Sequence, residues 1–318
     1  MGKYVAKRVI MALPLLFGIT VVIYFLLSIV PGGPLDVLKG SELTDGSFDY
    51  ENLKKSLGLD RPVYIRYIGW LRDVIEGDLG SSYRTMQPVT KMISQRIGPS
   101  VLLTGSGTLA AIIISIPIGI IAAYKPGSKW DGISSFFALA GATLPRFFIA
   151  ILAIYIFGVK LAWLPTMGMH SSGNESLQDL IRHLILPSAL ICFGTMGGLI
   201  KQTRSACLEI FNQDYMRTAR AKGIGEFAVV IKHGFRNALT PVITTILLHI
   251  PEIIGGSTIT ERIFGWPGIG SLMIDSISNR DYPVVMGIAL LISVTVLITN
   301  LALDIAYGLL DPRVTYDK

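Results

Sequence analysis

The chain has 318 residues, of which 51% are hydrophobic and 16% are charged, and its net charge is +6. Soluble domains carry about a quarter charged residues, so this balance, with several apolar runs of about 20 residues, excludes an ordinary soluble domain and predicts a polytopic α-helical membrane protein. In that class a positive net charge reflects basic loops on the cytoplasmic side, and nucleic acid is not an expected partner.

Six apolar segments are long enough to cross a hydrocarbon core of about 30 Å as helices. The first follows Lys3, Lys7 and Arg8, but it is too long for a signal peptide and is therefore interpreted as a retained span. Pro145 predicts a break or kink in the third segment. The predicted spans are 9–30, 100–124, 133–158, 184–205, 239–260 and 283–308.

Lysine and arginine are distributed unevenly between the loops. If the N-terminus is cytoplasmic, the inner segments carry fourteen of these residues and the short outer loops carry four. This is the positive-inside pattern. The chain then divides into an N-terminal segment with the first span (1–30), an external loop (31–99), a transmembrane core (100–308) with a cytoplasmic loop at 206–238, and a cytoplasmic tail (309–318).

The external loop is expected to contain short helices. Helical apolar spacing occurs at Leu53–Leu57 and at Tyr64–Ile75. The second stripe would lie on the membrane surface or pack against a partner. Its members are Tyr64, Tyr67, Ile68, Leu71 and Ile75.

A basic, polar island separates the fourth and fifth spans. Tyr215–Lys222 has the composition of a helix, and Gly223 stands where a helix-ending glycine is expected. A second, amphipathic helix fits Glu226–Leu239. The island is either a loop lying at the lipid headgroups or a docking site for a cytoplasmic partner. The predicted apolar face of the second helix consists of Phe227, Val230, Ile231, Gly234, Phe235 and Ala238.

The segment Asp214–Gly223 (DYMRTARAKG) resembles the cytoplasmic loop of ABC importer permeases, in the dipeptide, oligopeptide and nickel branch. The family pattern E-A-A, three residues, then Gly becomes Arg217-Thr218-Ala219 and Gly223, and its later I-x-L-P becomes His233-Gly234-Phe235-Arg236. The missing acidic residue and proline are usual in this branch. Further similar motifs follow the chain in order: Gly77–Ser82, Leu161–Pro165, Phe264–Gly270, Arg280–Pro283 and Leu310–Arg313.

The resemblance implies an all-α, type I importer fold with six transmembrane helices in the cytoplasmic membrane of a prokaryote. It also implies a second, non-identical permease, two cytoplasmic ATP-binding subunits that hold ATP and Mg²⁺, and an external solute-binding protein. The cargo would be a peptide, or alternatively a nickel chelate or glutathione. The residues expected to contact an ATP-binding subunit are Asp214, Tyr215, Arg217, Thr218, Ala219, Arg220, Ala221, Lys222 and Gly223.

Ionisable residues inside predicted spans are informative, because an unpaired charge is costly there, and four of them are candidates for a functional role. They are Arg146, His249, Glu252 and Asp304. His249 and Glu252 share a helix face. Arg146, His249 and Glu252 either line the substrate pathway, with Arg146 for a carboxylate and Glu252 for an amine, or form internal ion pairs. Asp304, near a span end, is expected to be structural.

The chain itself is not expected to be an enzyme. Its Gly-Lys pair, Gly2-Lys3, lacks the surroundings of an ATP-binding loop, so the energy must come from another subunit or from an ion gradient. A gradient-driven transporter would need a proton relay, for which His249 and Glu252 are the hint. An intramembrane protease would use Ser106 in Thr104–Gly107 with His249 as base.

Small residues and metal ligands have simpler interpretations. Thr104–Gly107 and the Gly194-x-x-x-Gly198 motif are more typical of close helix packing than of a catalytic site. His249-x-x-Glu252 supplies two ligands without a third, so no metal site is predicted. Cys192 and Cys207 lie in or beside one apolar segment, which argues against a disulfide framework.

Overall fold

The computed structural model describes residues 2–29, 35, 52, 54, 55 and 57–310. Their regular structure is helical, apart from the isolated β-bridges Ser81–Pro88 and Ser171–Asn174. The predicted helix at Leu53–Leu57, the tail 309–318 and the motif Leu310–Arg313 all include residues outside this description, as does most of the first part of the predicted external loop.

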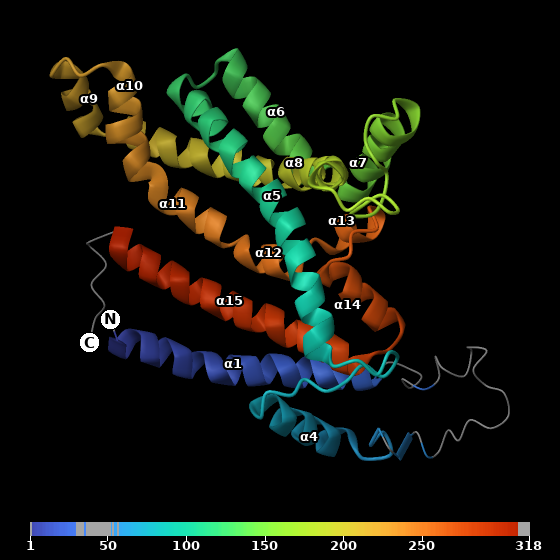
Figure 1. Cartoon of the computed structure of the whole chain (residues 1–318). Coiled ribbons are helices and arrows are strands. Elements are labelled where there is room, and N and C mark those ends of the chain that lie inside the picture. The colour runs from blue at the N-terminus through green and yellow to red at the C-terminus, as the bar shows by residue number, and fades with distance from the viewer. Residues whose placement is uncertain (1, 30–34, 36–51, 53, 56, 311–318) are drawn as a thin grey trace.

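Long apolar helices dominate the chain (Figure 1). Among the residues that the structure describes, five segments are long and apolar enough to cross a membrane, or six if a bent pair counts as one span. The single long helices are α1 (Gly2–Ile29), α5 (Val89–Tyr124), α8 (Leu177–Phe211) and α15 (Tyr282–Leu310). These segments overlap all six predicted spans, although α5 begins at Val89 rather than at residue 100.

Two of the membrane-length segments are interrupted. Helix α6 (Lys129–Thr143) meets α7 (Arg146–Ala153) at an angle of 102°, and the π-helix η1 (Ile154–Lys160) continues α7. Pro145 lies at this bend, as predicted. The segment Glu226–Ile263 is composite and consists of α10 (Glu226–Ala228), the π-helix η2 (Val229–Phe235), α11 (Arg236–Leu247), α12 (Ile250–Gly255) and α13 (Thr258–Ile263).

Small residues allow α8 to pack closely against α5 and α6. A Cβ placed on Gly107 of α5 would be 2.7 Å from Ile191 Cβ, and one on Gly197 of α8 would be 2.5 Å from the Ala138 carbonyl oxygen. Ser106 is part of this packing, because its hydroxyl lies 2.9 Å from that of Ser188. The prediction for Gly194-x-x-x-Gly198 was wrong at Gly198, which has open space around it, because α6 crosses α8 one residue earlier.

Helices α1 and α15 lie side by side, and α4 (Val63–Ile75) packs against α1 (Figure 1). Arg8 and Asp304 form an ion pair of 3.1 Å between α1 and α15, which agrees with a structural role for Asp304. The buried Tyr67 of α4 places its hydroxyl 3.0 Å from Thr20 Oγ1 of α1. Other members of its predicted stripe remain exposed: Tyr64, Ile68 and Ile75.

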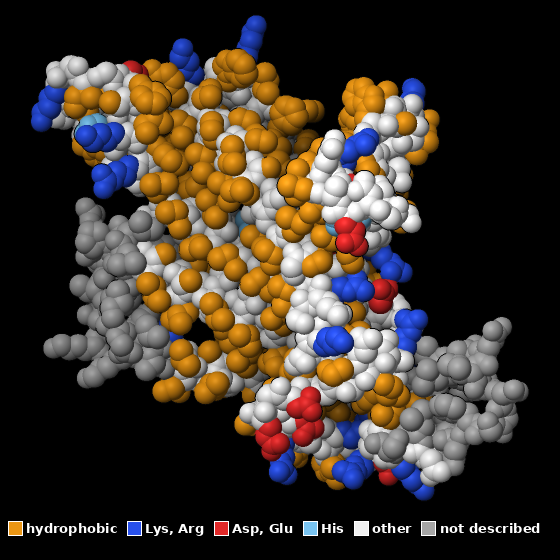
Figure 2. Space-filling view, viewed as in Figure 1, with side chains coloured by type: hydrophobic (Ala, Val, Ile, Leu, Met, Phe, Trp, Pro, Cys, Tyr) orange, Lys and Arg blue, Asp and Glu red, His pale blue; other side chains and the backbone are white. Residues whose placement is uncertain are grey.

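The molecule has two chemically different ends. A hairpin of α9 (Asp214–Ala221) and α10 projects beyond α5 and α6 at one end, whereas α4 and α14 (Ile269–Ser278) lie toward the other (Figure 1). Figure 2 shows hydrophobic side chains over the middle of the face in view, with basic side chains around the α9–α10 hairpin. This distribution is typical of a protein whose middle section lies in the hydrocarbon core of a membrane.

Candidate functional site

Helix α9 ends in a sharp, glycine-dependent turn. Its last backbone bonds run from Lys222 N to the Thr218 oxygen (3.1 Å) and from Gly223 N to the Arg220 oxygen (2.9 Å). Gly223 has φ +74°, a left-handed conformation that costs other L-residues about 1–2 kcal/mol. The structure therefore confirms the predicted helix and its terminating glycine.

The inner face of α9 is fixed to its neighbours. Met216 is fully buried and Ala219 nearly so, and they form a cluster with Val229 of η2. Phe211, at the end of α8, packs against the same cluster. Because this short helix is packed on both the preceding and the following helix, it is held in one position relative to both.

The outer face of α9 is polar and open. Of the nine residues predicted to contact a partner, Ala219 is buried and belongs to the internal packing, while the others are exposed. Arg220 forms an ion pair of 3.0 Å with Glu226, which joins α9 to α10 across the turn. The exposed residues are Asp214, Tyr215, Arg217, Thr218, Arg220, Ala221, Lys222 and Gly223.

The helix after the turn carries the predicted apolar residues, which differ in burial. Val230, Gly234 and Ala238 are buried, whereas Phe227 is 81% exposed. Phe227, Val230 and Ile231 line one apolar pocket against α5. The segment is not one regular α-helix, because the π-helix η2 lies within it.

Three sequence-predicted ionisable residues come together where α7 and α12 begin. Arg146 Nη1 lies 3.2 Å from Glu252 Oε1, and His249 Nδ1 lies 3.3 Å from Glu252 Oε2. Arg146 is the first residue of α7, and Glu252 lies in the first turn of α12. The side chains of Arg146 and Glu252 are 37% and 32% exposed. This is an internal ion pair, one of the two interpretations, and it remains open to the surface.

A second carboxylate, which sequence reasoning missed, holds together the end of the molecule that contains α13 and α14. Glu261 of α13 is fully buried and accepts hydrogen bonds of 2.8 Å from Ser100 Oγ and from Ser271 N. Gly256 and Gly268 lie so close that a side chain on either would collide with its carboxyl group. The signal in the sequence was a glutamate beside the glycine-rich Phe264–Gly270 motif. Glu261 thus joins α5, α13 and α14.

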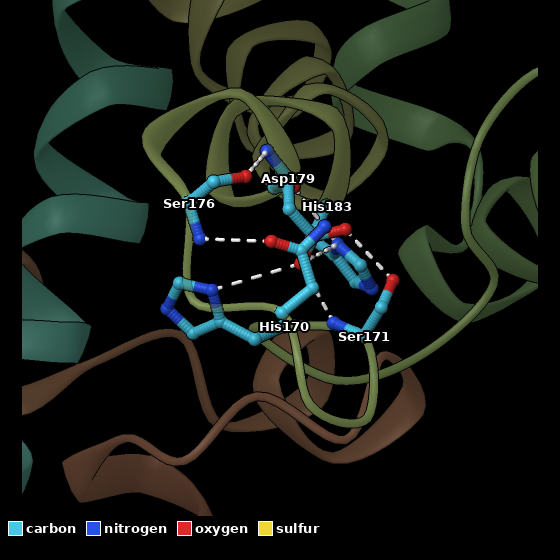
Figure 3. Close-up of polar contacts among 6 residues, drawn as sticks. His170, Ser171, Ser176, Asp179 and His183 are labelled. Carbon is cyan, nitrogen blue, oxygen red and sulfur yellow. Dashed lines mark hydrogen bonds and ion pairs between the residues drawn. The ribbon is translucent and has the colours of Figure 1, made fainter.

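The loop before α8 is fastened by Asp179, as Figure 3 shows. Its carboxylate accepts hydrogen bonds of 2.7 Å from both Ser171 N and Ser171 Oγ. His183 Nδ1 and His170 Nδ1 lie 3.5 and 3.7 Å from Asp179 Oδ2. Among the described residues no group of three or more His, Cys, Asp or Glu is suited to hold a metal ion. The hydrogen bonds to Ser171 fasten this loop to the first turn of α8.

A similar set of hydrogen bonds joins the loop before α5 to the start of α15. Asp281 accepts hydrogen bonds from Ser82 Oγ and from Tyr83 N, the latter of 2.9 Å. Burial raises the pKa of Tyr83 to about 12, so its phenol is neutral at ordinary pH. Ser82 and Asp281 belong to the motifs Gly77–Ser82 and Arg280–Pro283. The spacing of these motifs along the chain could not show that they lie in contact.

Comparison with known proteins identifies the family. The profile of the binding-protein-dependent transport system inner membrane components matches residues 115–316, and that of the N-terminal part of such membrane components matches residues 1–104. The chain belongs to this family. It is thus a multi-pass membrane protein and a permease subunit of an ABC transporter, as its motifs predicted.

Named relatives match this permease along its whole length. It is 40% identical over 318 residues to the oligopeptide transport system permease protein AppB of Bacillus subtilis (strain 168), covering 99% of this chain and 100% of the relative. It is 34% identical over 335 residues to the dipeptide transport system permease protein DppB of Alkalihalophilus pseudofirmus, covering 99% and 100%. It is 36% identical over 316 residues to the glutathione transport system permease protein GsiC of Escherichia coli (strain K12), again covering 99% and 100%.

Proposed function

We propose that this permease carries peptides across the cytoplasmic membrane and that separate ATP-binding subunits, docked on α9, supply the energy. The observation that carries the proposal is the construction of α9. Its apolar face is packed on α8 and η2, while its polar face is open to a partner. A rigid-body switch needs a stiff element that transmits movement, and a packed, terminated helix is one.

The distribution of charge supports a cytoplasmic location for α9. The α9–α10 hairpin contains Arg217, Arg220 and Lys222, and η2 adds Lys232. Basic loops lie on the cytoplasmic side of membrane proteins. The opposite end, with the Glu261 and Asp281 clusters, would then face outward and receive cargo from an external solute-binding protein. This arrangement would also put the start of α1 and the end of α15 on the cytoplasmic side.

The complete transporter would contain four membrane-associated subunits. This permease would pair with a second, non-identical permease, and two ATP-binding subunits carrying ATP and Mg²⁺ would dock on the pair. Relatives named for oligopeptide and dipeptide transport support a peptide cargo. The relative named for glutathione transport makes that tripeptide the second candidate.

The test is uptake by proteoliposomes that contain the complete transporter and its binding protein. Labelled dipeptides, oligopeptides and glutathione are compared with and without internal ATP, and with an uncoupler present. The proposal expects peptide uptake that requires ATP and persists with the uncoupler. Uptake that follows an ion gradient, or ATP-driven uptake of glutathione but not of ordinary peptides, would contradict it.

A further inference from the structure

Two interrupted helices meet at one ion pair. The α6–α7 segment breaks at Pro145, and Arg146 follows as the first residue of α7. The α11–α12 segment breaks at Leu248 and His249, and Glu252 lies in the first turn beyond the break. The Arg146–Glu252 pair therefore joins two places at which the backbone has lost regular helical support and can hinge.

This pair lies beside the midpoint of α8, a position expected near the centre of the membrane. The guanidinium of Arg146 packs against Gly194, the central residue of α8, where a Cβ would be 2.8 Å from Arg146 Nε. Ionised side chains at this depth are costly unless they face protein or water. Because about a third of each side chain is exposed, the surface that they share must be a water-lined path or a protein contact and not lipid.

The Arg146–Glu252 pair is built more loosely than a second inter-helix pair in the same chain. Arg204 of α8 binds Asp131 of α6 through two hydrogen bonds of 2.6 and 2.9 Å, and the Asp131 carboxylate also accepts one from Gly127 N. Asp131 is 9% exposed. By contrast Arg146 and Glu252 are joined at 3.2 Å and are both accessible, which suits a contact that is exchanged.

We propose that Arg146 and Glu252 form a charge lock on the translocation path, which the two charged ends of a peptide open by exchange. The inference rests on peptide import as the proposed function. The peptide carboxylate would bind Arg146 and the peptide ammonium would bind Glu252. Each protein charge keeps an opposite partner throughout, so the cost of leaving a charge unpaired at this depth is avoided.

The sizes of the partners connect this exchange to movement. The ends of an extended dipeptide are about 7 Å apart, since each residue spans about 3.3–3.6 Å. Arg146 and Glu252 are in contact, so binding both ends requires the two charged groups to separate, which movement of α7 away from α12 would achieve. The helix breaks at Pro145 and His249 are where such a movement would occur. His249, 3.3 Å from Glu252, would keep that carboxylate oriented while it changes partners.

The test compares three forms of one dipeptide in proteoliposomes that contain the complete transporter: the free peptide, its N-acetyl derivative and its C-terminal amide. The dipeptide is one whose three forms all bind to the binding protein in a direct binding measurement. Glu252→Gln is expected to lower uptake of the free peptide and the amide about tenfold, because each loses a charge-assisted hydrogen bond to its ammonium group. Uptake of the acetylated form, which has no ammonium group, should be spared. Arg146→Gln is expected to lower the free and acetylated forms and to spare the amide.

The matched control is Asp131→Asn, which breaks the other inter-helix pair and is expected to change uptake of all three forms by the same factor. Surface expression and the melting temperature of each purified complex show whether the variants fold. Equal fold-changes for the three forms in Glu252→Gln and Arg146→Gln would overturn the charge lock, as would loss of folding in both. If the unmodified transporter carries no peptide at all, the proposed function fails instead.

Discussion

Gly234 of η2 lies directly against Met216 of α9: a Cβ on Gly234 would be 3.1 Å from the Met216 methyl carbon and 2.5 Å from Phe211 Cε1. The missing side chain at Gly234 lets η2, α9 and the end of α8 meet at one point. Met216 is fully buried there, although it belongs to a short helix at the edge of the molecule. This contact makes α9 a fixed extension of two long helices.

Gly234→Val is expected to displace α9 without preventing membrane insertion. Overfilling a packed site costs about 1–3 kcal/mol, and here the strain would be relieved by moving α9 away from Phe211. Peptide uptake per ATP hydrolysed should fall, measured as the ratio of the two rates in proteoliposomes. Gly225→Ala is the control, because a Cβ at Gly225 has open space around it. An unchanged ratio in Gly234→Val would show that the packing of α9 is unimportant.

Gly223→Val is expected to uncouple ATP hydrolysis from uptake through backbone strain alone. No atom lies within 4 Å of a Cβ at this position, but φ is +74°. A strain of about 1–2 kcal/mol would raise the population with a displaced α9, relative to that with α9 in its present position, by a factor of about 5–30. Gly223→Asn should retain most coupling, since asparagine tolerates left-handed backbone. Equal losses in both variants would point to a role for the glycine other than its conformation.

Breaking the Arg220–Glu226 ion pair is expected to have little effect. Both side chains are about 40% exposed, and surface pairs contribute about 0–1 kcal/mol. Glu226→Gln should therefore change the uptake rate by less than about twofold, and high salt should mimic it. A large loss would mean that Glu226 contacts a partner subunit directly, which can be checked by measuring how tightly the ATP-binding subunits co-purify.

Glu261→Ala is expected to destabilise the end of the molecule that contains α13 and α14. The change leaves buried Ser100 and Ser271 donors without their acceptor, at about 1–3 kcal/mol each. Thermal unfolding of the purified permease in detergent should shift to lower temperature. Glu175→Ala, at an exposed residue of a neighbouring loop, should leave the unfolding temperature unchanged. Equal melting temperatures for Glu261→Ala and the unmodified protein would contradict the assigned role of Glu261.

Local patterns predicted much of this structure because the causes are themselves local. Hydropathy located the membrane-length segments, Pro145 located a bend, and Gly223 located the end of α9. The same approach did not reveal the π-helix η2, since a π-helix has no distinctive composition.

Partners distant in sequence lay beyond such reasoning. Arg146 and Glu252 were recognised as costly charges, but they are 106 residues apart and only the folded structure shows that they pair. Glu261 was overlooked because its acceptor role depends on Ser100, which lies 161 residues earlier in the chain.

The most direct measurement of the central claim is cross-linking from α9 in the assembled transporter. Arg217→Cys places a thiol on the open face, and Leu177→Cys places one on an exposed site at the other end of the molecule. Cys192 and Cys207 are buried and can be kept. A short bifunctional maleimide should join Arg217→Cys to an ATP-binding subunit and should not join Leu177→Cys to it. If Arg217→Cys gives no such product in a complex that still transports peptide, the assignment of α9 as the ATPase docking helix is wrong.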